Sequence, residues 1–345
     1  MSDVWGENIK ISIFGESHGV AIGVVIDGLP AGVTLDLEFL RAEMRRRAPG
    51  FCEFSTPRKE TDEVEILSGV YNGITTGSAL CGIIRNTNTR SQDYKPHLLR
   101  PGHADFTAFI KYGGFADPRG GGHFSGRLTA PLVFAGAIAK QILRERNIDI
   151  NARIVRIGQA CIESNAEFTA NSCELHDSFK EEILRAKASG DSVGGAIECV
   201  INGIPAGVGA PIFSSVESKI SAMMFSVPAV KAVEFGAGVA FAEMRGSNAN
   251  DEFYVENGEV RTKTNNNGGV NGGISNGMPI VFRATFKPTP SISMSQNTVD
   301  IEKMKNTTVE IEGRHDPCIV PRAVVVVEAA AALCILDLMG VRKYV

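Results

Sequence analysis

The segment from Arg100 to Ala130 combines histidine, arginine and serine side chains with a run of three glycines. It contains His103 and His123, and its basic residues are Arg100, Lys111, Arg119 and Arg127. Gly120-Gly121-Gly122 precedes an apolar pattern over 131–143 that predicts a helix. The backbone N–H groups of a glycine loop and a helix N-terminus bind anions, and histidine moves protons near neutral pH. A glycine-rich surface turn is the alternative, but the Arg, His and Ser content favours an anion-binding catalytic loop.

Three other stretches carry groups suited to chemistry. Ser17 and His18 lie in a glycine-flanked turn between strands predicted at 9–14 and 20–27. Arg45-Arg46-Arg47 ends a helix predicted over 36–47. Cations at a helix C-terminus are favoured by the helix dipole alone. Three consecutive arginines exceed what the dipole requires and favour an anionic ligand. Arg314-His315-Asp316 precedes a second apolar helix predicted over 320–339, and its Asp could simply be an N-cap.

Composition narrows the class of protein. The formal charge of −4 gives no bulk attraction for nucleic acid. Seven scattered cysteines without CxxC or Cys/His spacing predict buried, reduced thiols in a cytoplasmic protein and no metal site. The N-terminus carries no basic-then-apolar signal segment, and the apolar stretch from Ala323 to Gly340 contains Glu328 and Asp337. We therefore expect a buried helix there and no membrane span.

An internal repeat organises the chain. The sequence from Ile22 to Val33 recurs from Ile197 to Val208 as a strand followed by [DN]-G-[LI]-P-A-G-V, and a helical pattern follows each copy. Strands are also predicted at 64–69, 79–85, 152–157 and 279–286. We infer one domain of two similar α/β halves, about 9–160 and 193–340, with a peripheral polar excursion at 163–192. A site between the halves would take residues from both.

A Gly/Asn-rich loop at 265–277 leads into the predicted strand at 279–286, which ends in Lys287-Pro-Thr-Pro-Ser291. A flexible linker is one interpretation of this loop, and a second phosphate-holding surface is the other. The chain contains neither GxGxxG before a helix nor GxxxxGK[ST], so dinucleotide-Rossmann and P-loop folds lose support.

Taken together, these stretches resemble chorismate synthases. The matching motifs lie in order along the whole chain: GESHG (15–19), RRR-x-PG (45–50), ILSG (66–69), TTG (75–77), RSQDY (90–94), RPGHAD (100–105), GGG-x-x-S-x-R-x-T (120–129), KPTxS (287–291) and GRHDPC (313–318). The resemblance implies an α/β (α+β) fold, a β-α-β sandwich core with an internal pseudo-two-fold repeat. It implies a 1,4-anti elimination of phosphate from 5-enolpyruvylshikimate 3-phosphate to give chorismate, with reduced FMN required but no net redox change. It also implies a homotetramer.

The resemblance also implies roles for individual residues. His103 would protonate the departing phosphate, His18 would protonate or stabilise the reduced flavin, and Asp316 would help proton removal near the flavin. The implied substrate-binding residues, which suit a substrate with two carboxylates and a phosphate, are Ser17, Arg46, Arg47, Arg100, Ser125, Arg127 and Arg314. The implied FMN-binding residues are His123, Phe124, Ser125, Pro228, Ala229, Gly272, Lys287, Pro288, Thr289, Pro290, Ser291 and Arg314. Arg47 is also the implied NADP contact.

The chain departs from the family pattern at the flavin-facing loop and nearby. His123-Phe124 replaces a common Arg-Ser, Glu53 replaces an Arg, and Pro228 replaces an Asn. We expect His123 to act as a contact only. The reduced flavin would come either from NADPH or from an external flavin reductase. A flavin-independent lyase acting on a phosphorylated substrate, and an anion- or RNA-binding module, are the alternative functions.

Overall fold

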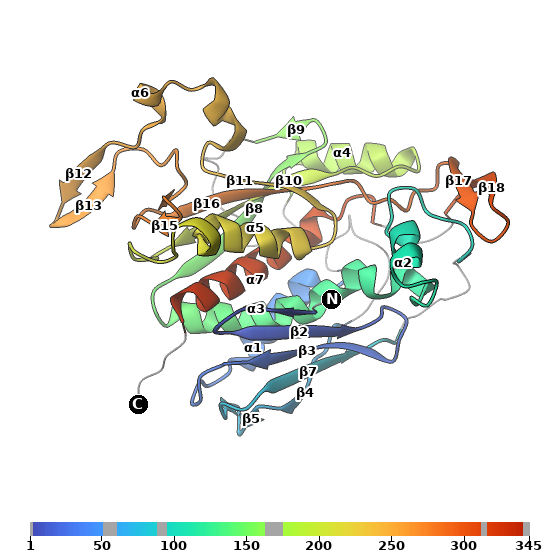
Figure 1. Ribbon diagram of the computed structural model, residues 1–345, viewed down its shortest axis with the longest axis horizontal. Helices are drawn as coiled ribbons and strands as arrows, with labels where there is room; N and C mark the ends of the chain where they lie inside the picture. The colour runs from blue at the N-terminus through green and yellow to red at the C-terminus, as the bar shows by residue number, and fades with distance from the viewer. Residues whose placement is uncertain (1–2, 51–60, 88–94, 163–174, 312–315, 341–345) are drawn as a thin grey trace.

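The computed structural model describes residues 3–50, 61–87, 95–162, 175–311 and 316–340. Within these residues two five-stranded sheets enclose a layer of helices (Figure 1). This arrangement confirms the predicted β-α-β sandwich of the α/β (α+β) class. No helix in the described part of the chain is both long and apolar enough to cross a membrane.

The first sheet is antiparallel throughout. In spatial order it contains β1 (Val4–Trp5), β2 (Lys10–Gly15), β3 (Ala21–Asp27), β7 (Leu80–Arg85) and β4 (Glu65–Ser68). Apolar side chains alternate along β3, where Ile22, Val24 and Ile26 are buried. One face of the sheet therefore covers the helical layer, as period-two patterning requires.

The second sheet has the same antiparallel construction. In spatial order it contains β11 (Val230–Phe235), β16 (Ile280–Phe286), β10 (Gly195–Asn202), β8 (Asp149–Ile157) and β9 (Ala160–Cys161). The predicted 163–192 excursion includes α4 (Asp177–Ala188), which packs against β8 and β9 (Figure 1). Phe179 and Ile183 are buried in that contact, so this helix covers part of the sheet.

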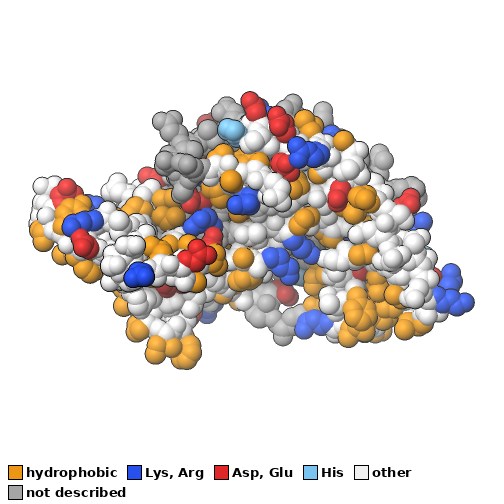
Figure 2. Space-filling model, turned by 90° about the horizontal axis from the view of Figure 1, so that it is seen from above, with side chains coloured by type: hydrophobic (Ala, Val, Ile, Leu, Met, Phe, Trp, Pro, Cys, Tyr) orange, Lys and Arg blue, Asp and Glu red, His pale blue; other side chains and the backbone are white. Residues whose placement is uncertain are grey.

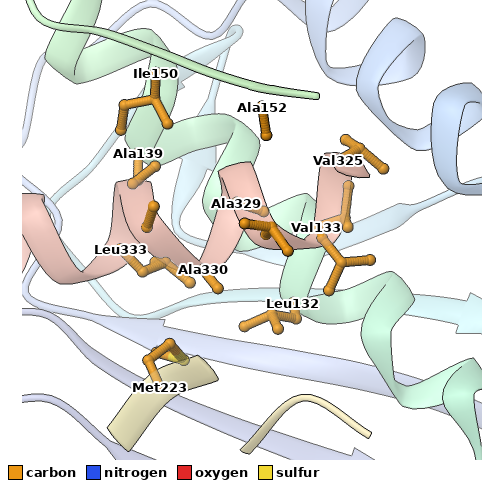
Figure 3. Packing of buried hydrophobic residues seen from close by; sticks show 14 of the residues in the cluster. Leu132, Val133, Ala139, Ile150, Ala152, Met223, Val325, Ala329, Ala330 and Leu333 are labelled. Atoms are coloured by element: carbon orange, nitrogen blue, oxygen red, sulfur yellow. The ribbon is translucent and has the colours of Figure 1, made fainter. Parts of the chain in front are cut away.

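The middle layer is built around α3 (Thr129–Arg144) and α7 (Val320–Met339), flanked by α1 (Leu37–Arg47) and α5 (Val216–Ser226). Small residues let α3 and α7 approach closely, and a side chain at Gly136 would overlap Ala329. Val133 and Ala139 of α3 belong to the core that α3 and α7 share with Ile150 of β8 (Figure 3). The predicted apolar helix at 320–339 is thus a core helix, because nearly all its residues are buried.

The two copies of the sequence repeat form the same local structure. Thr75 Oγ1 donates to the carbonyl of Pro30 (2.6 Å) and accepts from the N–H of Val33 (2.9 Å). Ser275 Oγ makes the equivalent bonds to Pro205 (2.7 Å) and Val208 (2.9 Å). Each hydroxyl pins the Pro-Ala-Gly-Val turn to a short hairpin that precedes β7 or β16. The strand order β2-β3-β7-β4 therefore corresponds to β8-β10-β16-β11.

Shorter elements extend from the sandwich. The hairpins are β5–β6 (Val70–Tyr71, Ile74–Thr75), β12–β13 (Phe253–Glu256, Glu259–Thr262), β14–β15 (Val270–Asn271, Ile274–Ser275) and β17–β18 (Gln296–Asp300, Lys305–Val309). The short helices are α2 (Asp105–Lys111) and α6 (Gly246–Ala249), and 3₁₀ turns cover Arg119–Phe124, Gly126–Leu128, Ile212–Ser214 and Gly238–Glu243. In Figure 1, β14–β15 and the arm carrying β12–β13 lie at one end of the sandwich, and α2 and β17–β18 lie at the other.

Candidate active site

The three consecutive glycines bring the two predicted catalytic histidines together. Gly120, Gly121 and Gly122 all have positive φ (+62°, +92° and +54°), a conformation that residues with a side chain rarely adopt. A Cβ on Gly120 would lie 2.5 Å from the Cδ2 and Nε2 atoms of His18. A Cβ on Gly121 would lie 3.3 Å from the Cε1 and Nε2 atoms of His103. The missing side chains therefore make room for both imidazole rings.

The loop after β2 is tied to this triglycine segment. The N–H of Ser17 donates to the carbonyl of Gly122 (3.1 Å), and its hydroxyl donates to the carbonyl of Arg119 (3.3 Å). His123 Nδ1 lies 2.8 Å from the carbonyl of Gly15, so it must donate a proton to that oxygen. His123 thus holds the triglycine segment against β2.

His103 is held by its own loop. Its Nδ1 lies 2.6 Å from Asp105 Oδ1, and Arg100 grips the same carboxylate through Nε (2.8 Å) and Nη2 (2.7 Å). Burial would raise the pKa of Asp105, but hydrogen bonds from Arg100 and His103 and their charges lower it far below its usual range. Asp105 is therefore a carboxylate at any physiological pH.

Two of the predicted arginines converge on a buried carboxylate. Asp62 accepts from Arg47 Nη1 (2.5 Å) and from Arg127 Nη1, and its side chain is fully buried. Burial alone would raise the pKa of Asp62, but Arg47 and Arg127 overcome that and lower it. Arg127 Nε also donates to Asn86 Oδ1 (3.1 Å). Asn86 Nδ2 in turn donates to the carbonyl of Gly19 (2.9 Å), which connects the arginine pair to the Ser17–His18 loop.

The first turn of α7 completes this side of the site. Arg322 donates through Nη1 to Asp316 Oδ2 (2.6 Å) and through Nε to the carbonyl of Arg47 (3.1 Å). Burial lowers the pKa of Arg322, and the charge of Arg47 acts in the same direction. Three guanidinium groups and two carboxylates are thus clustered at the start of α3 and α7, which leaves an excess of positive charge for an anionic ligand.

The structure does not bring Arg46 to this cluster. Its guanidinium binds Glu328 through Nη1 (2.7 Å) and Nη2 (2.9 Å) inside the helical layer. Lys140 and Glu43 complete the buried network. Successive helix residues point about 100° apart, so Arg46 faces the core while Arg47 faces the site. The structure therefore does not support the predicted ligand-binding role of Arg46, because its charge is matched within the protein.

The predicted flavin residues are only partly gathered. Lys287 follows β16; its N–H donates to the carbonyl of Ala229 (2.9 Å), and its Nζ donates to the carbonyl of Gly102. Pro228 and the 287–291 segment therefore lie beside the His103 loop. Gly272 lies in the β14–β15 turn, which precedes β16, at the other end of that strand. Within one chain it is remote from the rest, and Arg314 and Glu53 lie outside the described residues.

A cavity of about 390 Å³ lies next to His103. Arg100, Asp105, Gly121 and Phe124 contribute to its wall, and apolar residues of 98–109 and 301–311 form much of the remainder. Phe124, which replaces the serine common in the family, packs edge-to-face on Tyr112 with ring centroids 6.1 Å apart. The substitution at this position therefore serves the packing of the cavity wall.

Several residues of the site were not predicted as functional. Asp62, Asn86, Asp105 and Arg322 act by holding predicted residues in place. Asp105 lies inside a recognised motif, two residues after His103, and that spacing was the available signal. Asp62 and Asn86 have no local pattern, because their partners are far away in sequence.

The chain is similar to proteins of one known family. The family model described as chorismate synthase matches residues 9–339. A chorismate synthase of Methanocella arvoryzae is 48% identical over 98% of this chain and 94% of its own. One of Thermococcus gammatolerans is 47% identical over 98% of both chains. A crystal structure titled as chorismate synthase superposes with a TM-score of 0.76 at 31% identity, covering 97% of this chain and 92% of that one.

Proposed function

The chain belongs to the chorismate synthase family, and from this premise we propose which of its residues carry out the reaction. It is a lyase of the shikimate pathway that removes phosphate from 5-enolpyruvylshikimate 3-phosphate to form chorismate. The observation that carries our assignment is the contact of His18 and His103 with one triglycine segment. Two proton-transfer groups from distant loops are placed side by side there, next to a cluster of arginines.

We propose that Arg100 and Arg127 bind the carboxylates and the phosphate of the substrate, whereas Arg47 is buried and held by Asp62. The hydroxyl of Ser125 accepts from the N–H of Arg127 (3.3 Å). Guanidinium forks match such oxyanions in shape and charge. Ser17 and Ser125 supply further hydroxyl groups, and Arg314 keeps the role that the resemblance gives it. Arg46 is left out of this set because Glu328 and Glu43 bind it.

The proton transfers are assigned to three side chains. His103 donates a proton from Nε2 to the phosphate oxygen that leaves with the C–O bond. Asp316, held by Arg322, accepts a proton in the elimination, and His18 holds one beside the cofactor. A positioned general acid or base contributes about 10²–10⁴-fold to a rate.

We propose reduced FMN as the cofactor, held by the Lys287–Ser291 segment and by the backbone of Pro228 and Ala229. The hydroxyl of Thr289 supports this fit, because it is buried and has no hydrogen-bond partner among the described residues. Lys287 offers a positive charge; burial lowers its pKa, with Lys231 acting in the same direction. When bound, the reduced flavin supplies electron density to the substrate and recovers it.

We propose that an external reductase supplies the reduced flavin. Arg47, the implied NADP contact, has a side chain only 4% exposed and is bound by Asp62 and Thr129. In this arrangement its guanidinium offers no surface to a nicotinamide nucleotide.

A homotetramer and a cytoplasmic location are also proposed. Exposed apolar side chains on α2 and the segment after it support association, among them Phe106, Phe109, Ile110 and Phe115. Hydrophobic side chains also gather on the projecting arm at the left of Figure 2, where Phe253, Val255 and Val260 of β12–β13 are exposed. The described cysteines are free thiols, which fits a reducing compartment. Cys161, however, is exposed, unlike the predicted buried thiols.

We further propose that the chain is a single domain built from two halves, 9–160 and 193–340. The matching hydrogen bonds of the two repeat copies support this division. Light scattering and limited proteolysis test the assembly and the domain count separately.

An anaerobic assay tests the proposed function. Enolpyruvylshikimate phosphate is mixed with the enzyme and chemically reduced FMN, and chorismate and phosphate are measured together. A parallel reaction contains oxidised FMN and NADPH. We expect equal amounts of both products in the first reaction and none in the second. Product in the second reaction would overturn the external-reductase proposal. Product formed in the absence of any flavin would overturn the proposal that reduced FMN is the cofactor.

A further inference from the structure

We propose that Asp105 is a positioning residue that fixes the tautomer of His103. The interaction holds the proton on Nδ1 and leaves Nε2 directed at the triglycine segment. This inference rests on the proposed function, in which His103 is the acid that protonates the departing phosphate. It adds a group that does not touch the substrate but decides which nitrogen of His103 can do so.

The hydrogen-bond geometry places the proton. His103 Nδ1 and Asp105 Oδ1 are 2.6 Å apart, a distance that requires a proton between them. The carboxylate cannot supply it, since the pKa of Asp105 is far below its usual range. The proton is therefore on Nδ1 of the imidazole. Arg100 Nη2 also lies 3.1 Å from this nitrogen, but it donates to Asp105 Oδ1 at the shorter distance of 2.7 Å.

Asp105 is itself held rigidly. Its Oδ2 accepts from the side chain of Arg100 (Nε, 2.8 Å) and from the backbone N–H of the same residue (3.0 Å). A carboxylate bound by both ends of one guanidinium has little freedom to rotate. The imidazole of His103 is therefore aligned by a fixed acceptor, the arrangement by which second partners orient functional histidines.

The other nitrogen faces the segment that gathers the site. His103 Nε2 and Cε1 are the atoms that a Cβ on Gly121 would approach to 3.3 Å. Nε2 is thus directed to the same backbone that lies against His18. With Nδ1 occupied by Asp105, this is the nitrogen that can exchange a proton with a ligand.

Other charged groups lie near the His103–Asp105 pair. His18 lies against Gly120, the neighbouring residue of the triglycine segment. Lys287 reaches the neighbouring carbonyl of Gly102 from the end of β16. The remaining titratable groups on the wall of the shared cavity are Lys95, His97, Asp117, Glu302 and Glu310. Among these described groups, Asp105 is the acceptor that contacts the His103 ring.

The direct test is the ¹⁵N spectrum of histidine in the full-length protein, which reports which ring nitrogen carries the proton. The chain has six histidines, and the His103→Gln variant identifies the signals of His103. We expect the wild type to show the Nδ1–H form. We expect Asp105→Asn to lose it, because one of the two acceptor oxygens becomes an NH2 donor, which would face either the N–H groups of Arg100 or Nδ1 of His103. A wild-type spectrum with a proton on Nε2 and none on Nδ1 would overturn the proposal even if the variant fails to fold.

Asp117→Asn is the matched control for this spectrum. Asp117 also accepts a fork from an arginine, at 2.9 and 2.7 Å from Arg119, and it lines the same cavity without contacting His103. We expect it to leave the His103 signals unchanged. If Asp117→Asn removed the Nδ1–H form as fully as Asp105→Asn, the specific role of Asp105 would be refuted.

Kinetics supply the second readout. We expect Asp105→Asn to lower kcat about 10–100-fold with KM changed little, as for other residues that orient a functional histidine. An unchanged kcat would overturn the proposal. Full turnover by His103→Gln would instead reject the proposed acid, while the spectrum still tests the tautomer.

Discussion

Replacing Gly120 with alanine should move His18 and slow the reaction far more than it destabilises the fold. The new Cβ would lie 2.5 Å from the His18 ring and 2.8 Å from Ser17 Oγ, whereas ordinary contact begins at 3.4 Å. The ring must therefore shift by about 0.9 Å, and a displacement of about 1 Å can cost roughly 10²-fold in rate. The left-handed backbone adds about 1–2 kcal/mol of destabilisation.

Gly32→Ala separates these two effects. Gly32 also has a positive φ, +82°, but nothing lies within 4 Å of the position its Cβ would take. We expect both variants to lose a similar amount of stability in urea unfolding, with only Gly120→Ala losing turnover in the anaerobic assay with reduced FMN. Turnover of Gly120→Ala within twofold of Gly32→Ala would refute the placement of His18 against the triglycine segment.

Three further outcomes follow from the buried charges and thiols. Asp62→Asn should lower the unfolding free energy by about 3–5 kcal/mol in urea titrations, because two buried guanidinium groups lose their shared carboxylate; a loss below 1 kcal/mol would contradict this. Lys140 and Arg46 lower the pKa of Glu328 against the effect of its burial. Wild-type stability should therefore fall as the pH drops below about 4.5, and less steeply in Glu328→Gln, as unfolding at pH 3–7 would show. Burial raises the pKa of Cys318 to about 12, so at pH 8 a thiol reagent should modify exposed Cys161 and spare Cys318 until the protein unfolds.

The regular elements were predictable because local patterns determine them. Helix α1 begins after Asp36, whose carboxylate caps the N–H groups of Glu38 and Phe39. It ends at Arg47, as predicted, two residues before Pro49. The repeat predicted two similar strand-and-turn units, and their hydrogen bonds are the same. Strands and helices with strong periodicity therefore lie within a few residues of the predicted ranges.

The partners of the charged side chains could not be predicted in this way. Arg46 and Glu328 are 282 residues apart, and Arg127 and Asp62 are 65 apart. No local pattern states which arginine of the triplet faces the core and which faces the site, because that depends on the crossing of three helices. The distance of Gly272 from Lys287 likewise follows from the length of β16 and its antiparallel pairing.

The most direct test of the whole account compares His103→Ala with His123→Arg under anaerobic conditions with reduced FMN. Proton donation is assigned to His103, whereas His123 contacts the Gly15 carbonyl and the Asp3 carboxylate. We predict that His103→Ala loses at least about 10²-fold in kcat while still binding substrate, and that His123→Arg stays near the wild-type rate. Near-normal turnover by His103→Ala, or loss of turnover by His123→Arg with FMN affinity intact, would contradict it.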